Sequence, residues 1–455
     1  MHVAIVGGGP GGLMTGYLLR KLANRPFRLT LFESSERLGG KVLTPRFSRF
    51  AAAYEAGAAE FYDYSPIDED PLKELVAELG LSITPMGGNS VFLSDRRYAT
   101  LEDVGGGLGP AVERGWLDFH ERSRDRMSAR EFYESDNSEF CGEAVTGNSA
   151  VERKRFESER SQLGSHSLQA FVETLIHSDL AAEWEQTSVG YGLQNYLMND
   201  PRYMRLYSIA GGNEQLVERL AERTAMEVCL RQRVLSVAGV DSGVMRLRIG
   251  CADGEIERDF DTVVLCLPML ALTALEFRGE RLRRAMARHM GHHDHPAHYL
   301  RVTVLFRRRF WSSWLVDSWC MLDAWGGCCV YDETARQPGS EFGILGWLFG
   351  GAAAVELNGM TDEQLIAAAV RTLPRDQDSA SELLIEGRVH RWIGAVSAMP
   401  GGERPTRLDF RHQPEPVDHA GLFVVGDYLF DSTLNGVLDS AGCVAGWLAA
   451  ELERR

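Results

Sequence analysis

The first 22 residues constrain the fold of this chain more than any other feature. Residues 2–6 form a short, β-branched apolar run of the kind that lies buried on both faces of a sheet. A glycine cluster interrupted by one proline follows at 7–12, and residues 13–22 then show a helical pattern. Strand, glycine turn and helix in this order predict the beginning of a doubly wound α/β fold.

The glycines fit the G-x-G-x-x-G frame at Gly7, Gly9 and Gly12. In such a frame the first glycine permits a tight turn, the second admits a pyrophosphate, and the third lets the helix pack closely on the strand. A second strand is expected at 28–32, and it ends in Glu33, 21 residues after Gly12. A carboxylate at this distance accepts hydrogen bonds from a ribose and favours FAD or NAD over NADP.

Length and charge limit the remaining possibilities. The chain has 455 residues, which suggests two or three domains, and its net charge of −16 argues against a nucleic-acid or anionic-membrane partner. No apolar run reaches the roughly 18 residues of a membrane helix. The eight cysteines include no Cys-x-x-Cys pair. We therefore expect a cytoplasmic protein with reduced thiols, no nucleic-acid partner and no membrane anchor, while a homodimer stays open.

A second glycine motif follows the first. Residues 36–41 read Glu-Arg-Leu-Gly-Gly-Lys, which resembles the second signature of the flavin-containing amine oxidase family. Gly39 and Gly40 would let the backbone approach the cofactor again, and Arg37 and Lys41 would neutralise a pyrophosphate. The resemblance implies that the cofactor is FAD.

The resemblance continues in distant parts of the chain. It implies that the backbone of Val234 meets the adenine, and that Gly426 and Asp427 lie beside the ribityl chain and the pyrophosphate. Val437 and Leu438 fall in a motif whose helix N-terminus points at the flavin ring in this family. The positive end of a helix dipole at that place stabilises the negative charge of reduced flavin.

These segments imply an α/β protein with a discontinuous Rossmann-type domain. The FAD-binding domain would comprise residues 1–81, 205–270 and 405–455. An α+β substrate-binding domain would comprise residues 82–204 and 271–404.

Arg301 is the first candidate catalytic residue on the substrate side. It occupies the place where many family members carry a lysine that holds a water near flavin N5. A guanidinium stays charged, so it can hold a water or a carboxylate but cannot act as a neutral base. The alternative is a solvated arginine near the end of a strand.

Glu60 is the second candidate. It lies in a Gly-rich segment where amino-acid oxidases of the family carry an arginine that grips the substrate carboxylate. A glutamate there repels a carboxylate and attracts an ammonium group. A structural Glu60 paired with a nearby cation is an equal alternative.

The walls of the pocket are expected to differ from those of well-known members. Val437 stands where many members have an aromatic residue, and residues 393–399 contain neither a tyrosine nor a cysteine for a covalent flavin. We therefore expect no aromatic cage and a noncovalent FAD. Trp392 is a candidate pocket wall, with plain core packing as the alternative.

Four histidines gather at His292, His293, His295 and His298. We expect this segment to be a loop without a metal, because the spacing follows no helical ligand pattern. His298 is expected to reach the substrate pocket, since it lies just before the strand of Arg301.

The residues together predict an FAD-dependent oxidoreductase that acts on an amine or an amino-acid-derived small molecule. Hydride transfer to flavin N5 would give an imine, and dioxygen would reoxidise the flavin with release of hydrogen peroxide. One alternative is a dehydrogenase or desaturase that acts on a C–C or ring C–H bond of a specialised metabolite. Another is a flavin-bound protein without turnover.

Overall fold

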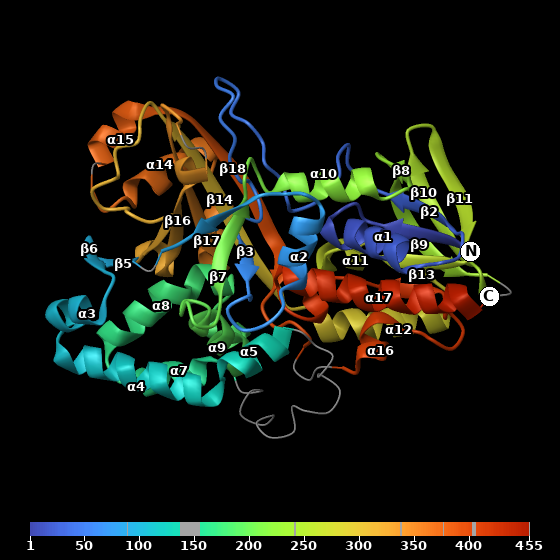
Figure 1. Cartoon of the computed structure of the whole chain (residues 1–455), viewed down its shortest axis with the longest axis horizontal. Helices are drawn as coiled ribbons and strands as arrows, with labels where there is room; N and C mark the ends of the chain where they lie inside the picture. Colours follow the sequence, from blue (N-terminus) through green and yellow to red (C-terminus); the bar gives the residue numbers. More distant parts are fainter. Residues whose placement is uncertain are drawn as a thin grey trace.

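The computed structural model describes residues 1–88, 90–136, 155–240, 243–336, 339–375, 377–402 and 406–454. Figure 1 shows two lobes: a first lobe that holds both chain ends, and a second lobe built on a larger sheet. None of the described helices combines the length and the apolar composition that a membrane crossing needs.

A five-stranded parallel sheet forms the centre of the first lobe and confirms the predicted fold class. Its order is β19 (Leu422–Val424), β12 (Thr262–Leu265), β1 (His2–Val6), β2 (Arg28–Phe32) and β8 (Glu227–Cys229). Helices α1 (Pro10–Leu22), α2 (Pro71–Glu78), α10 (Glu214–Arg223) and α17 (Leu434–Arg454) lie on one face of this sheet (Figure 1).

Strand β1 is buried on both faces, as its apolar run predicts. Val3 and Ile5 pack with the helices on one face, whereas Ala4 and Val6 pack into a second core on the other. A small sheet contributes to that second core, in the order β11 (Gly254–Phe260), β10 (Met245–Cys251), β9 (Arg233–Gly239) and β13 (Glu276–Arg278).

Side chains between residues 271 and 293 pack into the first lobe, past the domain limit expected at residue 270. Phe277 of β13 and Leu282 of α12 (Glu280–His293) belong to the core beneath β1, in the first lobe. If the limit between the two lobes is placed where this packing ends, it falls near residue 294 rather than 270. The limit expected at 405 lies outside the described residues.

The second lobe contains a seven-stranded sheet. Its order is β18 (Leu384–Ser397), β14 (Pro296–Phe306), β17 (Gly343–Gly350), β16 (Cys328–Asp332), β15 (Trp319–Leu322), β5 (Ser90–Leu93) and β6 (Arg96–Tyr98). The apolar core on one face includes side chains of α4 (Pro110–Arg126), α5 (Ala129–Asp136), α8 (His166–Leu180) and α9 (Val189–Leu197). The core on the other face includes those of α13 (Gly351–Leu357) and α14 (Asp362–Arg371).

A three-stranded antiparallel sheet connects the lobes. It consists of β3 (Phe61–Asp63), β7 (Arg205–Ile209) and β4 (Ile83–Met86). Phe61 packs into the core of the first lobe, whereas its neighbour Tyr62 packs against the core of the second. The other described α-helices are α3 (Leu101–Leu108), α7 (Glu157–Arg160), α11 (Met269–Thr273), α15 (Gln377–Leu383) and α16 (Leu408–His412).

Candidate active site

A cavity of about 420 Å³ lies where the two lobes meet. The first lobe contributes the carboxyl ends of its parallel strands, including Gly7, Glu33 and Asp427. The second lobe contributes Arg301 and Trp392 from β14 and β18. The crevice beyond the carboxyl ends of the strands is where open α/β sheets bind their ligands.

Glycines of both motifs lie at the floor of this cavity or directly behind it, and a Cβ atom on several of them would collide with neighbouring backbone. Gly7 has a φ of +110°, and a Cβ atom on it would lie 2.3 Å from the carbonyl oxygen of Cys266. A Cβ on Gly12 would lie 2.1 Å from the carbonyl oxygen of Gly7. Gly9 and Gly40 face each other, since a Cβ on Gly40 would approach the Cα of Gly9 to 3.2 Å. Gly7, Gly9 and Gly40 thus present bare backbone to the cavity, which suits a ligand such as a pyrophosphate.

Glu33 lies at the end of β2 on the cavity wall. Its Oε2 accepts a 2.8 Å hydrogen bond from the Gly8 amide, and its Oε1 accepts one of 2.7 Å from the Ser35 amide. These bonds fix the carboxylate and leave lone pairs for ribose hydroxyl groups.

The two predicted cations of the second glycine motif take different positions. Lys41 lines the cavity, and its Nζ lies 3.4 Å from Oδ2 of Asp427. Arg37 instead donates to the carbonyl oxygens of Leu38 at 3.0 Å and Gly40 at 2.7 Å. Arg37 thus braces the glycine turn, whereas Lys41 reaches the cavity wall, where its Nζ also donates to the Ala395 carbonyl.

The N-terminus of α17 points at the cavity. The helix begins at Leu434, and Thr433, Leu434 and Val437 all line the wall. The amide of Gly426, at the end of β19, donates a 3.1 Å hydrogen bond to the Ser440 hydroxyl of the same helix. This bond joins the β19 turn to the helix whose positive dipole end faces the site.

Some predicted cofactor residues support the cavity from behind. Five of the residues predicted to bind the cofactor do not line the cavity: Gly12, Arg37, Gly39, Val234 and Leu438. Val234 and Leu438 are buried in the two cores that flank the parallel sheet. The contact of the Val234 backbone with adenine stays a prediction.

Arg301 lies fully buried at 0% exposure on β14, so it is not a solvated strand-end arginine. Its Nη2 forms an ion pair with Oε1 of Glu333, and its Cζ lies 4.9 Å from the centre of the Tyr331 ring. Its Nε and Nη1 have no hydrogen-bond partner. Arg301 lines the cavity, so a ligand or a water that reached these buried donors would satisfy them.

Glu60 also lines the cavity, next to Arg301. Its Oε1 accepts a 3.0 Å hydrogen bond from the Tyr331 hydroxyl, and its buried Oε2 has no partner. Burial raises the pKa of Glu60, while the charges of Arg301 and Arg336 oppose that shift. An ammonium group beside Oε2 would compensate the cost of a buried carboxylate.

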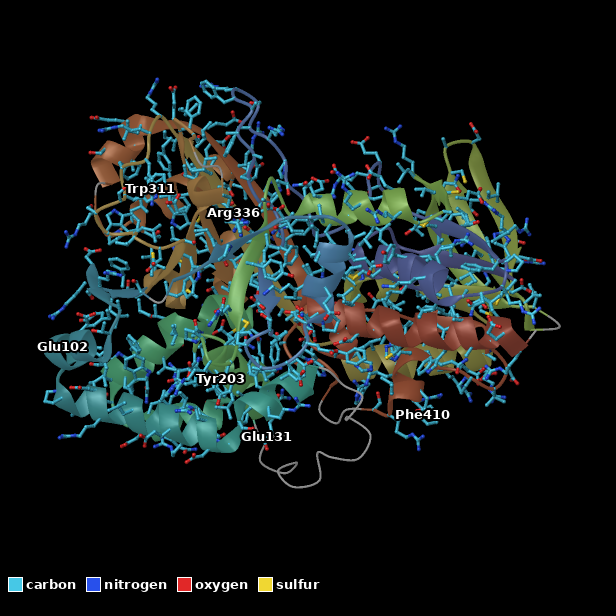
Figure 2. All side chains as sticks on the ribbon, in the orientation of Figure 1. Glu102, Glu131, Tyr203, Trp311, Arg336 and Phe410 are labelled. Atoms are coloured by element: carbon cyan, nitrogen blue, oxygen red, sulfur yellow. The ribbon has the colours of Figure 1, made fainter. Side chains whose placement is uncertain are left out.

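A chain of buried charges continues behind Arg301. Glu333 also lies 3.3 Å from Nε of Arg336. Nη1 of Arg336 donates a 2.6 Å hydrogen bond to the Ala59 carbonyl and lies 3.9 Å from the Glu55 carboxylate. Figure 2 shows Arg336 close to the junction of the lobes. Burial raises the pKa of Glu55 to about 7, with Arg336 opposing the shift.

The cavity has aromatic walls, including the candidate Trp392, although Val437 and residues 393–399 supply none of the rings. Tyr299 on β14 lies opposite Trp392 on β18, and both line the cavity together with Tyr62. The Trp392 indole donates a 2.7 Å hydrogen bond to the Ala56 carbonyl, which fixes its ring. Val437 has no ring, but other parts of the fold supply four aromatic wall residues: Phe61, Tyr62, Tyr299 and Trp392.

The histidine segment is not the expected loop. His292 and His293 belong to α12, because residues 280–291 contain no proline that would end the helix earlier. His298 is not on the cavity wall, and its Nδ1 accepts a 3.0 Å hydrogen bond from the Gly394 amide. Across the described part of the chain, no three His, Cys, Asp or Glu residues form a group that could hold a metal ion.

Sequence reasoning missed Tyr62, Tyr299, Tyr331 and Glu333. Residues i and i+2 of a strand share a face, so Tyr299 could have been predicted from Arg301. The sequence contains no comparable signal for Tyr331 and Glu333, which β16 and the turn after it bring to Arg301 from 30 residues away or more.

Bare glycines and an acid at the carboxyl ends of parallel strands are the arrangement by which doubly wound folds bind dinucleotides. The family model "flavin containing amine oxidoreductase" matches residues 10–447 of the chain. The protein belongs to this family, as its motifs indicate, and is a flavin-dependent oxidoreductase of the amine oxidase type.

Solved structures show the same fold along the whole chain. Cyclohexylamine oxidase from Brevibacterium oxydans is 17% identical, with a TM-score of 0.75 and coverage of 100% of this chain and 99% of that one. A putrescine oxidase double mutant is 16% identical, with a TM-score of 0.73 and the same coverage. At these identities the likeness establishes the fold alone.

Curated relatives match a shorter stretch. Prenylcysteine oxidase 1 of Rattus norvegicus is 33% identical over 101 residues, which are 22% of this chain and 19% of the relative. Probable polyamine oxidase 4 of Arabidopsis thaliana is 31% identical over 93 residues, which are 20% and 17%. The chain thus aligns with only about a fifth of the length of these relatives.

Proposed function

We propose that this protein binds FAD noncovalently and oxidises a small amine or an amino-acid-derived molecule. When bound near Gly7, Glu33 and Lys41, FAD would supply the redox chemistry: removal of a hydride from the carbon beside the substrate nitrogen, with dioxygen as the final oxidant and hydrogen peroxide as its product. Water then hydrolyses the imine product.

The residues of the first lobe fit this cofactor. The bare glycine floor suits the pyrophosphate, Glu33 suits the adenosine ribose, and Lys41 supplies a cation. Cys266 is the one cysteine among the described residues of the wall, and burial raises its pKa to about 12. A thiol held in the protonated state is a poor nucleophile, which supports noncovalent binding.

The observation that carries the amine assignment is the free Oε2 of Glu60 in an aromatic cavity. A buried carboxylate with an unused oxygen attracts a cation, and aromatic faces stabilise an ammonium group further. Tyr299 and Trp392 supply such faces. Glu60 would thereby orient the substrate so that its reacting carbon faces the cofactor.

Arg301 has a different task in this proposal. Its guanidinium stays protonated, so it holds a water or a carboxylate through Nε and Nη1 rather than removing a proton. Glu333 keeps the guanidinium in place from the other side. A substrate with a carboxylate beside its amine would use both Arg301 and Glu60.

Two structural neighbours are a cyclohexylamine oxidase and a putrescine oxidase, which agrees with an amine substrate. One observation favours the alternative of a dehydrogenase for a C–C or ring C–H bond. This observation is Arg301, which stands where the family resemblance implies a lysine.

The test is anaerobic titration of the FAD-loaded protein with amines, amino acids and cyclic alkenes. We expect amines to bleach the flavin absorbance, and we expect air to restore it with formation of hydrogen peroxide. Bleaching by the hydrocarbon substrates alone would favour the dehydrogenase. Failure of every amine and amino acid to bleach the flavin would refute the amine assignment, even if the protein holds FAD.

A further inference from the structure

Five charged side chains form one continuous group between the cavity and the start of α10. Arg301 pairs with Glu333, which also contacts Arg336. Arg336 in turn reaches Glu55, with 3.9 Å between its Nη1 and Oε1 of the glutamate. Glu60 is the fifth member, because the charges of both guanidinium groups act on its carboxyl group. We call these five residues the buried charge chain.

The buried charge chain contains three carboxyl groups but only two guanidinium groups. In the described part of the structure, no other lysine or arginine forms an ion pair with its members. If all five groups were ionised, one negative charge would stay unbalanced away from water, which is costly. We therefore expect one of the three carboxyl groups to hold a proton until a further cation arrives.

The contacts within the chain favour Glu55 as the holder of this proton. Glu333 contacts both guanidinium groups, and Glu60 feels the charges of both, whereas Glu55 pairs with Arg336 alone. Burial raises the pKa of Glu55 to about 7, with Arg336 opposing the shift and Glu333 adding to it. The charge of Glu55 also raises the pKa of Arg301, so its influence reaches the cavity wall.

The surroundings of Glu55 suit both the neutral and the ionised state. Its Oε1 accepts a 2.9 Å hydrogen bond from the Asn213 amide. The Thr44 hydroxyl lies 3.0 Å from Oε2, and a hydroxyl can donate to a carboxylate or accept from a carboxylic acid. The Thr44 amide donates to Glu214 at 2.9 Å, and both residues are partly exposed. A proton on Oε2 is therefore only a short distance from solvent.

Asp179, in the last turn of α8, is a further acid near Glu60. Burial and the charge of Glu60 raise the pKa of Asp179 well above its usual value. None of the described residues forms an ion pair with it. Asp179 is therefore neutral, and it does not enter the charge count of the buried charge chain.

We propose that Glu55 holds a proton in the free protein and releases it to solvent when an ammonium group binds beside Glu60. The ammonium group adds the third positive charge, which balances three ionised carboxylates. The one bond that breaks is the O–H bond of Glu55, and water or buffer takes the proton. Glu55 acts through Arg336 and is a positioning residue. This inference rests on the proposed function, because it assumes that the cavity binds amines.

The test is the pH dependence of amine binding between pH 6 and 8, measured with n-butylamine by anaerobic stopped-flow reduction of the flavin. An alkylamine stays protonated in this range, as a lysine side chain does. Because amine binding competes with the proton on Glu55, the dissociation constant should fall about tenfold from pH 6 to pH 8. A constant value would overturn the inference and leave the amine assignment intact. Failure of amines to reduce the flavin at any pH would instead refute the proposed function.

Two variants assign the effect to Glu55. Glu55→Gln keeps the shape and an acceptor for the Asn213 amide but cannot ionise, so it should lose the tenfold pH dependence. Thr44→Val removes a hydroxyl that lowers the pKa of Glu55, so the change in affinity should move to higher pH. Glu78→Gln is the matched control, since this acid bonds to Lys21 outside the cavity wall and should behave as wild type. A pH dependence that survives in Glu55→Gln would assign the proton to another group and contradict the proposal.

Discussion

Tyr331 and Glu60 are joined by a 3.0 Å hydrogen bond from the tyrosine hydroxyl to the carboxylate. The same tyrosine ring lies 4.9 Å from the guanidinium carbon of Arg301. One residue of β16 therefore positions both charged groups on the substrate side of the cavity. Its role follows from the order of the seven-stranded sheet, in which β16 reaches β14 through β17.

Tyr331→Phe tests this relationship. The hydroxyl lowers the pKa of Glu60, which burial raises, so its loss should raise that pKa further. Amine binding needs the ionised carboxylate of Glu60. The acid limb of the pH profile for amine binding should therefore move to higher pH, by on the order of one unit. The measurement is the pH dependence of kred/Kd for an amine. Tyr17→Phe is the matched control, since it removes a 2.9 Å bond to Glu78 outside the cavity and should leave the profile in place.

Arg301→Ala should slow flavin reduction by amines while the protein keeps its flavin, because Arg301 faces the cavity from the second lobe. The variant should also melt at lower temperature, since Glu333 stays buried with Arg336 as its remaining partner. Adding Glu333→Gln should recover stability but not rate. Arg307→Ala, at an exposed position after the same strand, is the control. Unchanged reduction kinetics in Arg301→Ala would remove Arg301 from the site.

The raised pKa of Glu55 should make the free energy of unfolding depend on pH. Its folded pKa of about 7 lies above the ordinary value of 4.5, so folding favours the neutral form. The stabilisation is complete below pH 4.5 and is lost as the pH rises through 7. Relative to wild type, Glu55→Gln should therefore gain on the order of 3 kcal/mol in unfolding free energy between pH 4.5 and 8.

Urea unfolding of both proteins at several pH values measures this difference. Glu356→Gln, on the exposed side of α13, should show no such trend. A constant difference between Glu55→Gln and wild type across the range would mean that Glu55 is ionised throughout.

Gly12→Ala should abolish tight flavin binding, because the new methyl group would lie 2.1 Å from the Gly7 carbonyl oxygen and push α1 away from β1. Gly446→Ala is the matched control, since it adds the same methyl group to α17 in open space. The ratio of flavin to protein absorbance after gel filtration distinguishes them. A yellow Gly12→Ala protein with full flavin content would show that the turn tolerates a side chain.

The cofactor side of this site was predictable because its residues lie in local motifs. Gly7, Glu33 and Asp427 each stand at the end of a buried apolar strand, and such ends meet at one edge of a parallel sheet. Even there, the motif did not distinguish Lys41, which faces the cavity, from Arg37, which braces the turn. That distinction depends on side-chain direction, which spacing does not determine.

The substrate side was less predictable because its contacts are distant in sequence. Glu333 meets Arg301 through the pairing of three strands, β14, β17 and β16. His298 illustrates the opposite error. It is close to Arg301 in sequence, yet it binds the Gly394 amide and does not reach the cavity wall.

The visible spectrum of the purified protein, recorded before and after denaturation, tests the central claim most directly. The arrangement of the glycine floor, Glu33 and the N-terminus of α17 predicts a yellow protein. Denaturation should release equimolar, unmodified FAD into the supernatant. A protein that is colourless and stays so after incubation with FAD would contradict the account, and flavin that stays attached to the precipitated chain would contradict noncovalent binding.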